Sequence, residues 1–245
     1  MIISLLSTSH VLARATPGNF DLLVSHHSLP PPFLPVLLLE EIEGLIVVSL
    51  LSSCEMSTLS PSSPTIITLK PIEATPESFA PFGQVIPASS DRDRFGPQDA
   101  QLELHRGVPR LYIMKLEDRH LKFASITHHA SVTQCLGSIG GDEWYLGIAK
   151  PSILKESEIG NEDGRKPIKA LCGHYYIPPN PNEVCVFRFS GPKFVKLNVG
   201  TWHAGPLFKK RTMDFYNLEL SDTNILDHTT HNFRKNDNVV FEIED

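Results

Sequence analysis

The sequence lacks the features that mark several large classes of protein. It has no run that approaches the roughly 20 apolar residues needed to span a membrane. None of its cysteines forms a CxxC pair, so neither a zinc ribbon nor a thioredoxin-like site is indicated. Basic residues are also few, with 22 Lys and Arg against 28 Asp and Glu and a net charge of −6. Because nucleic acids and anionic membranes both select a basic surface, we expect neither as a partner.

The four cysteines stand singly, at Cys54, Cys135, Cys172 and Cys185. Isolated thiols in a chain of 245 residues fit a reducing compartment, so a cytoplasmic location is predicted. Cys135 and Cys185 lie in strand-like runs, where we expect them to be small core residues. A hydrophobic content of 41% is enough for one large domain, or for one domain with a tail.

Residues 1–65 differ in composition from the rest of the chain. They hold seven of the 20 prolines, and their two short apolar runs, 36–39 and 45–53, are separated by acidic residues. Five acids against the single Arg14 do not suit a transit peptide, which is usually poor in acids, but organellar targeting by this extension stays open as an alternative. We predict that residues 1–65 are disordered or lie upstream of the working protein, with Met56 as a natural start.

From residue 66 to residue 245 the pattern predicts one all-β domain. Short runs alternate apolar and polar residues, are rich in Val, Ile, Tyr and Phe, and are separated by Gly, Pro, Asn or Asp. No helical pattern of ten residues or more is convincing. Such a series of short strands predicts an antiparallel sandwich or barrel. The expected strands are 66–72, 110–116, 121–129, 132–139, 143–149, 173–178, 184–189, 193–199, 213–220 and 239–243.

One short helix and two exposed segments complete the predicted domain. Thr75 is a suitable N-cap, Pro76 suits the first helical position, and Gly83 is a stop signal, so a helix of about a turn and a half is expected. Residues 88–107 are polar and predict a long exposed loop. Residues 151–171 are a charged excursion between strands, which we also expect to be exposed to solvent.

A first polar cluster lies where two expected strands meet. His128 and His129 are adjacent, so at most one of them faces a barrel interior, because neighbours in a strand point to opposite faces. Gln134 is close enough to be brought back by a short hairpin turn, and Glu143 opens the next strand. An imidazole, an amide and a carboxylate could therefore line one mouth of the barrel. The alternative is that both histidines are solvated in a turn.

A second polar cluster follows the expected strand 193–199. Trp202 and His203 stand side by side, and residues 204–212 are expected to form a turn before Asp214 opens the next strand. A carboxylate beside an imidazole raises its pKa and fixes its tautomer, so His203 and Asp214 are candidate partners. The alternative is a purely structural His–Asp hydrogen bond, and a Trp in this position is more often core than substrate platform.

The two clusters together offer part of a metal site. A jelly-roll that binds metal usually takes two histidines and an acid from one hairpin and a third histidine from a later strand. The adjacent His128 and His129 lack the His-x-His spacing that puts both rings on one face, and a neutral Gln134 would weaken a site for a hard cation. The pattern therefore demands no cofactor. If a divalent metal such as Mn²⁺ is bound, its expected ligands are His129, Glu143 and His203.

Three segments carry the motifs of one family: 67–86, 128–149 and 195–220. With them the chain resembles the ureidoglycolate lyases, also known as ureidoglycolate hydrolases, a cupin-like branch of the jelly-roll class. The resemblance spans about residues 66–245, and its most specific part is the late Trp-His motif followed by an Asp-Phe strand. The matching residues are Phe79, Phe82, Gly83, His129, Thr133, Gln134, Trp202, His203, Pro206, Leu207, Phe208, Asp214 and Phe215.

The resemblance implies an enzyme of allantoin and purine breakdown that splits ureidoglycolate into glyoxylate and urea. Such a reaction needs a base for the substrate hydroxyl, an acid for the departing nitrogen and a cation for the carboxylate. It also implies a homodimer with a cupin-like antiparallel jelly-roll barrel. By resemblance and residue chemistry, the expected catalytic residues are His129, His203 and Asp214, and the expected substrate-binding residues are Arg110, Gln134, Lys196 and Trp202.

Three departures from the family pattern leave other functions open, and one of them is the segment 151–171, which is longer than the family leads us to expect. Ala204 stands where many members have a second histidine, and Asn198 stands near the position of another. The first alternative is a different metal-dependent cupin enzyme acting on a small organic acid. The second is a cupin that binds a small molecule without turning it over.

Overall fold

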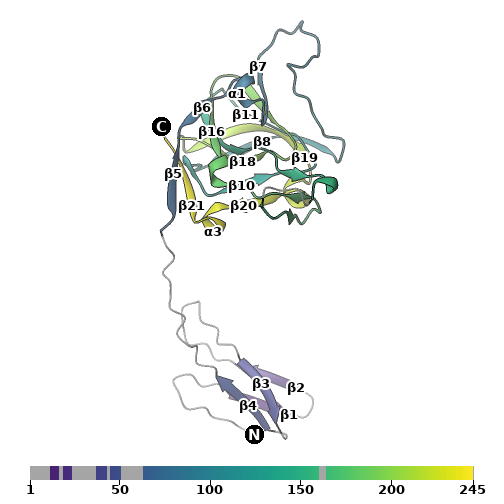
Figure 1. Cartoon of the computed structure of the whole chain (residues 1–245), viewed down its shortest axis with the longest axis vertical. Coiled ribbons are helices and arrows are strands. Elements are labelled where there is room, and N and C mark those ends of the chain that lie inside the picture. Colours follow the sequence, from purple (N-terminus) through teal and green to yellow (C-terminus); the bar gives the residue numbers. More distant parts are fainter. Residues whose placement is uncertain are drawn as a thin grey trace. The chain divides into compact units, whose positions relative to one another are not determined.

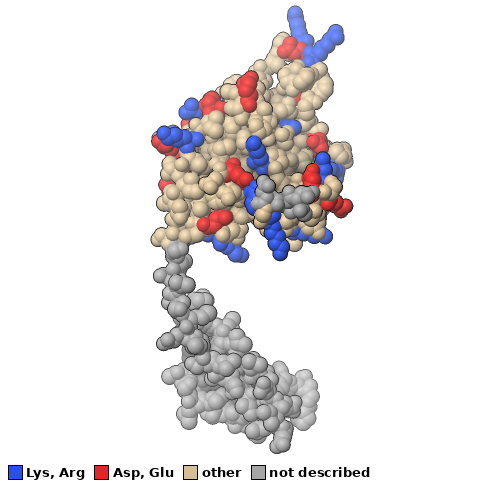
Figure 2. Space-filling view, viewed as in Figure 1, with Lys and Arg blue, Asp and Glu red and all other residues tan. Residues whose placement is uncertain are grey.

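The chain divides into two compact units, Met1–Ser60 and Pro61–Asp245. The computed structural model (Figure 1) describes residues 63–159 and 164–244 of the second unit, together with four strands of the first. No helix in these described parts is long and apolar enough to cross a membrane. On the face shown in Figure 2, acidic and basic side chains of the second unit are interspersed, without a large area of one sign.

The first unit contains two antiparallel hairpins. Their strands are β1 (Leu12–Thr16) with β2 (Asn19–Leu23), and β3 (Leu37–Ile42) with β4 (Leu45–Leu50). The second hairpin coincides with the two apolar runs, which pair with each other. Met56 and the remaining residues of this segment lie outside the described residues.

The second unit is all-β, as predicted, and its two largest sheets are mostly antiparallel. The six-stranded sheet consists, in spatial order, of β20 (Thr229–Asn232), β10 (Ser125–His128), β18 (Trp202–Leu207), β12 (Trp144–Ala149), β16 (Cys185–Phe189) and β6 (Pro71–Glu73). The five-stranded sheet consists of β7 (Gly83–Pro87), β17 (Lys193–Leu197), β11 (Gln134–Ser138), β19 (Thr212–Leu220) and β8 (Pro109–Glu117).

Smaller elements complete this unit. A three-stranded sheet joins β5 (Thr65–Leu69), β21 (Val239–Ile243) and β9 (Lys122–Phe123). Another joins β13 (Ile153–Leu154), β15 (Tyr175–Tyr176) and β14 (Ile168–Lys169), so the charged excursion contributes two very short strands. The short helices are α1 (Pro76–Phe79), α2 (Thr223–Leu226), α3 (Phe233–Asn236) and the 3-10 turns η1 (Glu156–Glu158) and η2 (Pro181–Glu183).

The predicted N-terminal helix signal is confirmed in detail. Thr75 is the N-cap of α1, its hydroxyl accepts from the backbone N–H of Ser78 at 3.1 Å, and Pro76 occupies the first helical position. The Ser78 hydroxyl in turn accepts from the backbone N–H of Thr75 at 2.9 Å. This reciprocal pair satisfies donors that a helix start otherwise leaves unpaired. The helix then packs the ring of Phe79 edge-on against Phe187 and Phe189 in the core.

The central strand β12 is buried on both faces because each face meets a different apolar cluster. Trp144 and Ile148 point between the two large sheets, where they join Leu136 and Phe215. Tyr145 and Ala149 point to the other face, where they join a second apolar cluster that includes Phe241 of β21. A side chain at Gly147 would collide with the ring of Phe123, since a Cβ there would lie 2.4 Å from it. Each face of this six-stranded sheet is therefore covered, as its continuously apolar sequence requires.

Residues 202–207 form a strand, whereas residues 204–212 were expected to form a turn. The Gly205–Pro206 pair is typical of turns, but β18 continues through it and pairs with β12 and β10. The pairing with β12 shifts register between Tyr145 and Gly147, and this irregularity accommodates a proline that cannot donate to the ladder. The late Trp-His motif therefore lies inside a sheet, and this places its two side chains on opposite faces.

Candidate functional site

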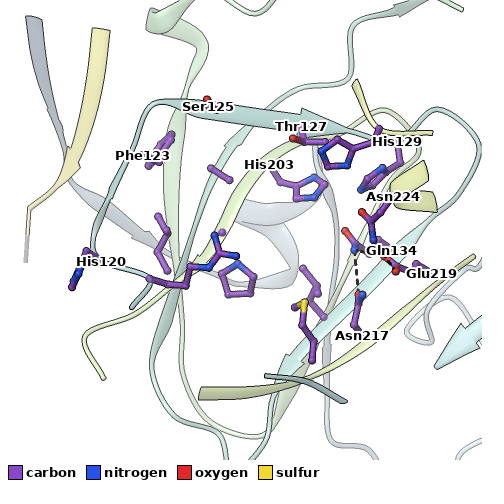
Figure 3. A pocket seen from close by; sticks show the side chains of 18 of the residues that line it. His120, Phe123, Ser125, Thr127, His129, Gln134, His203, Asn217, Glu219 and Asn224 are labelled. Atoms are coloured by element: carbon purple, nitrogen blue, oxygen red, sulfur yellow. Dashed lines mark hydrogen bonds between the residues drawn. The ribbon is translucent and has the colours of Figure 1, made fainter. Parts of the chain in front are cut away.

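A cavity of about 700 Å³ opens at one end of the space between the two large sheets (Figure 3). We call it the histidine cavity. Its walls come from β8, β10, β11, β18 and β19 and from the loop that precedes β9. The polar and charged residues among its lining are Tyr112, Asp118, Arg119, His120, Lys122, Ser125, Thr127, His129, Gln134, His203, Asn217, Glu219, Asn224 and His228.

His129 and His203, both expected at the site, meet in this cavity. His203 lies on β18, where its pairing with Thr127 of β10 brings it beside the end of that strand, and His129 follows the end of β10 directly. The two ring centroids are 5.3 Å apart, and the ring of His228 lies 5.7 Å from that of His129. Both His129 and His203 are buried, while the adjacent His128 points to the other face.

The backbone fixes the same tautomer in both histidines. His129 Nδ1 is hydrogen-bonded to the carbonyl oxygen of Asp227, and His203 Nδ1 lies 3.2 Å from the carbonyl oxygen of Thr201. A carbonyl can only accept, so in each ring Nδ1 carries the proton. Each Nε2 is consequently left with a lone pair, and the site holds two proton acceptors of the same kind.

Burial keeps these rings neutral. Desolvation and, to a smaller extent, the neighbouring His129 lower the pKa of His203 to about 3. Desolvation also lowers the pKa of His129, against the opposing effect of its hydrogen bond to Asp227. Removing an imidazolium from water is costly, so both rings are uncharged at neutral pH.

A polar network on β8, β11 and β19 forms the wall beside the histidines. Gln134 donates its side-chain N–H groups to Asn217 Oδ1 and Glu219 Oε2, both at 3.1 Å. The same Glu219 accepts from Tyr112 Oη at 3.3 Å and from Asn224 Nδ2 at 3.1 Å. Glu219 is only 1% exposed, and its burial is compensated by these donors. Figure 3 shows Gln134, Asn217, Glu219 and Asn224 together on one side of the cavity.

The side-chain carbonyl of Gln134 is oriented by this network. Because Asn217 Oδ1 and Glu219 Oε2 are both acceptors, the amide nitrogen of Gln134 must face them. Its Oε1 is buried and has no hydrogen-bond partner among the described residues. A buried acceptor without a donor costs free energy, so this oxygen is a natural partner for an N–H group of a ligand.

Arg119 brings a cation to the cavity wall. It lies in the loop between β8 and β9, and no carboxylate of the described residues is within ion-pair distance of its guanidinium. Lys122, the neighbouring cation, is instead paired with Glu242 at 2.7 Å. Arg119 is thus the lining cation that is available to an anionic ligand.

Arg110 and Lys196, two predicted substrate-binding residues, do not line the histidine cavity. Arg110 does not line the cavity itself, but its guanidinium stacks 3.7 Å from the ring centre of Tyr112 and lies 3.9 Å from Glu219 Oε1. Lys196 points to the other face of β17, where it donates to Asn198 Oδ1 at 2.8 Å. It lines a separate pocket beneath residues 95–103.

Trp202 does not wall the cavity, contrary to expectation. It points to the opposite face of β18, is fully buried, and donates Nε1–H to Ser152 Oγ at 2.9 Å. Its ring packs edge-on against that of His128, with centroids 4.0 Å apart. This is the core role that a tryptophan most often has.

The expected pair of His203 and Asp214 is not formed. Between β18 and β19 the chain crosses from the six-stranded to the five-stranded sheet, so the two residues are not on adjacent strands. Asp214 is exposed opposite Lys115 of β8 and does not line the cavity. The orienting acceptor of His203 is instead the carbonyl of Thr201.

The expected metal ligands do not assemble. Glu143 lies at the start of β12 on the surface, where it accepts from Tyr145 Oη at 2.7 Å and lies 3.9 Å from Arg188. The two free Nε2 atoms of His129 and His203 would suit a metal, but they lack this third ligand. Among the residues that the structure describes, no three His, Cys, Asp or Glu side chains are grouped to hold an ion.

Several cavity residues were not foreseen. Asn217 and Glu219 interrupt the inward-facing apolar row that Met213 and Phe215 begin on β19, so alternation along this strand was a usable signal. Arg119 lies in the loop between β8 and β9, where no alternation of apolar and polar residues marks it as facing a cavity.

Comparison with known proteins does not extend this description. A scan against protein-family models found no match, and a search of curated proteins found none either.

The buried histidines predict a stability that decreases in acid. Burial lowers the pKa of His128 and of His203 to about 3. The same rings in the unfolded chain titrate near their ordinary pKa of about 6.5, so below that pH the unfolded state binds more protons. The free energy of unfolding should therefore fall from about pH 6.5 toward pH 5, by at most about 1.4 kcal/mol per pH unit for each ring.

Urea unfolding of the full chain at a series of pH values measures this slope. A His203→Gln variant should show a smaller slope, and His105→Gln, on an exposed loop, should keep it. Stability that does not change between about pH 7 and pH 5 would contradict the neutral, buried state of these rings.

Proposed function

We propose that the protein is a ureidoglycolate lyase, which splits ureidoglycolate into glyoxylate and urea. The substrate carries a hydroxyl and a ureido nitrogen on the same carbon, next to a carboxylate. In the reaction the hydroxyl loses its proton, the carbonyl of glyoxylate forms, the C–N bond breaks and the nitrogen of urea gains a proton. No water is consumed, so a buried site with proton acceptors suits it.

The observation that carries this proposal is the pair of Nε2 lone pairs in one cavity. His129 and His203 each have Nδ1 committed to a backbone carbonyl, which leaves Nε2 to take the hydroxyl proton. The imidazolium formed in this way then donates the proton to the departing nitrogen, which is bonded to the same carbon. The ring centroids lie 5.3 Å apart, so both rings are close enough to meet one substrate molecule, and which of them carries the proton is left open.

The remaining groups match the two ends of the substrate. Gln134 Oε1, which has no partner among the described residues, would accept an N–H of the ureido group. Arg119 would bind the carboxylate, in the role that the sequence suggested for Arg110 or Lys196. Glu219 and Asn217 are positioning residues, because they accept from the Gln134 amide and so orient its carbonyl oxygen toward the substrate.

The proposal includes a cupin-like jelly-roll arrangement of the two large sheets and a cytoplasmic location. The facing six- and five-stranded sheets, with the cavity at one end of the space between them, support the fold. The cysteines that the structure describes, Cys135, Cys172 and Cys185, are all free thiols, which suits a reducing compartment. Of the alternatives, a metal-dependent cupin has less support, because Glu143 lies outside the cavity.

The proposal also includes a homodimer formed through β8. This nine-residue strand is at the edge of the five-stranded sheet, and its outward side chains Leu111 and Ile113 are 69% and 59% exposed. A long apolar edge strand favours pairing with a second copy about a two-fold axis. Sedimentation equilibrium should give a dimer that Ile113→Lys converts to monomer; a wild-type monomer at micromolar concentration would reject this assembly.

Loss of either histidine should abolish most of the activity. His203→Asn and His129→Asn each remove an Nε2 acceptor, and losing a general acid or base typically costs about 10²–10⁴-fold in kcat. Release of glyoxylate from ureidoglycolate measures this. His105→Asn, on an exposed loop, is the matched control and should retain wild-type kcat.

Substrate binding by the same variants separates an enzyme from a binding module. Calorimetry with ureidoglycolate should show that the two variants still bind it. Binding by the wild-type chain without any release of glyoxylate would instead favour the non-catalytic alternative, and an unchanged kcat in His203→Asn would remove that ring from the chemistry.

Arg119→Ala should raise KM for ureidoglycolate by about tenfold or more, because it removes a charge-assisted contact to the carboxylate. Arg119→Lys should recover part of this loss, since it restores the charge but not a bidentate contact. Steady-state kinetics measure both, with the loop variant Arg94→Ala as control. A KM in Arg119→Ala equal to that of the wild type would mean that another group binds the carboxylate.

A further inference from the structure

A second cluster of reactive side chains lies on the far side of β10 from the histidine cavity. Cys172 is exposed in the tight turn between β14 and β15. Backbone hydrogen bonds from Ala170 N–H to the His174 carbonyl and from Gly173 N–H to the Ala170 carbonyl close this turn. Its Sγ lies 3.2 Å from His174 Nδ1. A thiol within hydrogen-bond distance of an imidazole is the arrangement in which a base can take the thiol proton.

A third side chain holds His174 in place. His174 Nε2 lies 2.7 Å from Nε2 of His128, so one proton is shared between these two nitrogens. His128 is completely buried between the rings of Trp202 and Tyr176, and its Nδ1 has no partner among the described residues. Packing therefore fixes the position of His128, and the short hydrogen bond fixes the orientation of His174.

This hydrogen bond has two tautomeric forms, and in one of them His174 can take the thiol proton. When His174 donates Nε2–H to His128, its Nδ1 has a free lone pair and can accept from Cys172. If His174 then takes that proton, both of its nitrogens still have acceptors, Sγ on one side and His128 on the other. A nucleophile, a base and a group that orients the base are thus joined by two consecutive hydrogen-bond contacts.

The surroundings leave room for a small partner molecule. A pocket of about 250 Å³ lies beside the turn, and Cys172, Lys169, Leu226 and Thr229 are among its lining residues. Burial lowers the pKa of His174, and the Asp227 carboxylate opposes this shift. Asp227 Oδ1 lies 4.0 Å from Sγ, and the two carboxylate oxygens accept the backbone N–H groups of residues 130 and 131. Lys169 adds a cation to the lining of the pocket.

We propose that Cys172, His174 and His128 form an activated-thiol site at which Cys172 exchanges with small disulfides. His174 takes the thiol proton, and Sγ attacks one sulfur of the disulfide. The S–S bond of the partner breaks, its second sulfur leaves as a thiolate, and that thiolate takes the proton from His174. The products are a mixed disulfide on Cys172 and one small thiol, so no other oxidant is needed. The site does not depend on the lyase proposal.

Alkylation of the full chain tests the activation. With limiting iodoacetamide at neutral pH, peptide mass spectrometry follows each cysteine separately. Cys172 should react about tenfold faster than the thiol of free glutathione, and His174→Gln should remove about tenfold of its rate. The loop variant His105→Gln should leave the rate unchanged.

Two results would overturn the site. One is a wild-type rate at Cys172 no higher than that of free glutathione, which needs no variant to fold. The other is an unchanged rate in His174→Gln, which would leave exposure alone as the cause of reaction. Incubation with oxidised glutathione tests the exchange reaction itself. The mixed disulfide should form on Cys172 of the wild type, and it should form much more slowly in His174→Gln. Its absence from wild-type Cys172 would reject the exchange reaction.

Discussion

Alternation along β18 is the constraint on which the site depends. The strand lies between β10 and β12 inside the six-stranded sheet, so each of its side chains must face either the space between the large sheets or the cluster behind it. Trp202 goes to the cluster behind and His203 to the cavity. The same alternation in β10 sends His128 toward Trp202, and the chain beyond the strand carries His129 to His203.

The chemistry of the cavity follows from backbone carbonyls rather than from side-chain acids. Asp227 and Thr201 each accept an Nδ1–H, and this sets two neutral rings with free Nε2 atoms side by side. The buried carboxylate of the cavity, Glu219, accepts from Gln134 and holds it in place. Neutral bases, an amide carbonyl and the Arg119 cation would suit a polar, singly anionic molecule, which is why a proton-transfer enzyme is the function we favour.

Much of this arrangement could be predicted from the sequence. The capping residues of α1 are local signals, alternation identified most of the strands, and the family resemblance placed His129, Gln134 and His203 in one site. Three expectations failed for non-local reasons. A register shift in β12 lets β18 run through Gly205 and Pro206, the change of sheet after β18 separates Asp214 from His203, and surface ion pairs hold Glu143 outside the cavity. The pairing of strands decides which residues lie side by side, and this pairing cannot be read from the local pattern of a single sequence.

The most direct measurement is the product balance of the purified full chain with ureidoglycolate. Glyoxylate, urea and ammonia are quantified together over time against a protein-free control. Elimination by the two histidines predicts glyoxylate and urea in equal amounts, faster than in the control, with no ammonia. Glyoxylate formation no faster than in the control, or ammonia released in place of urea, would contradict the account.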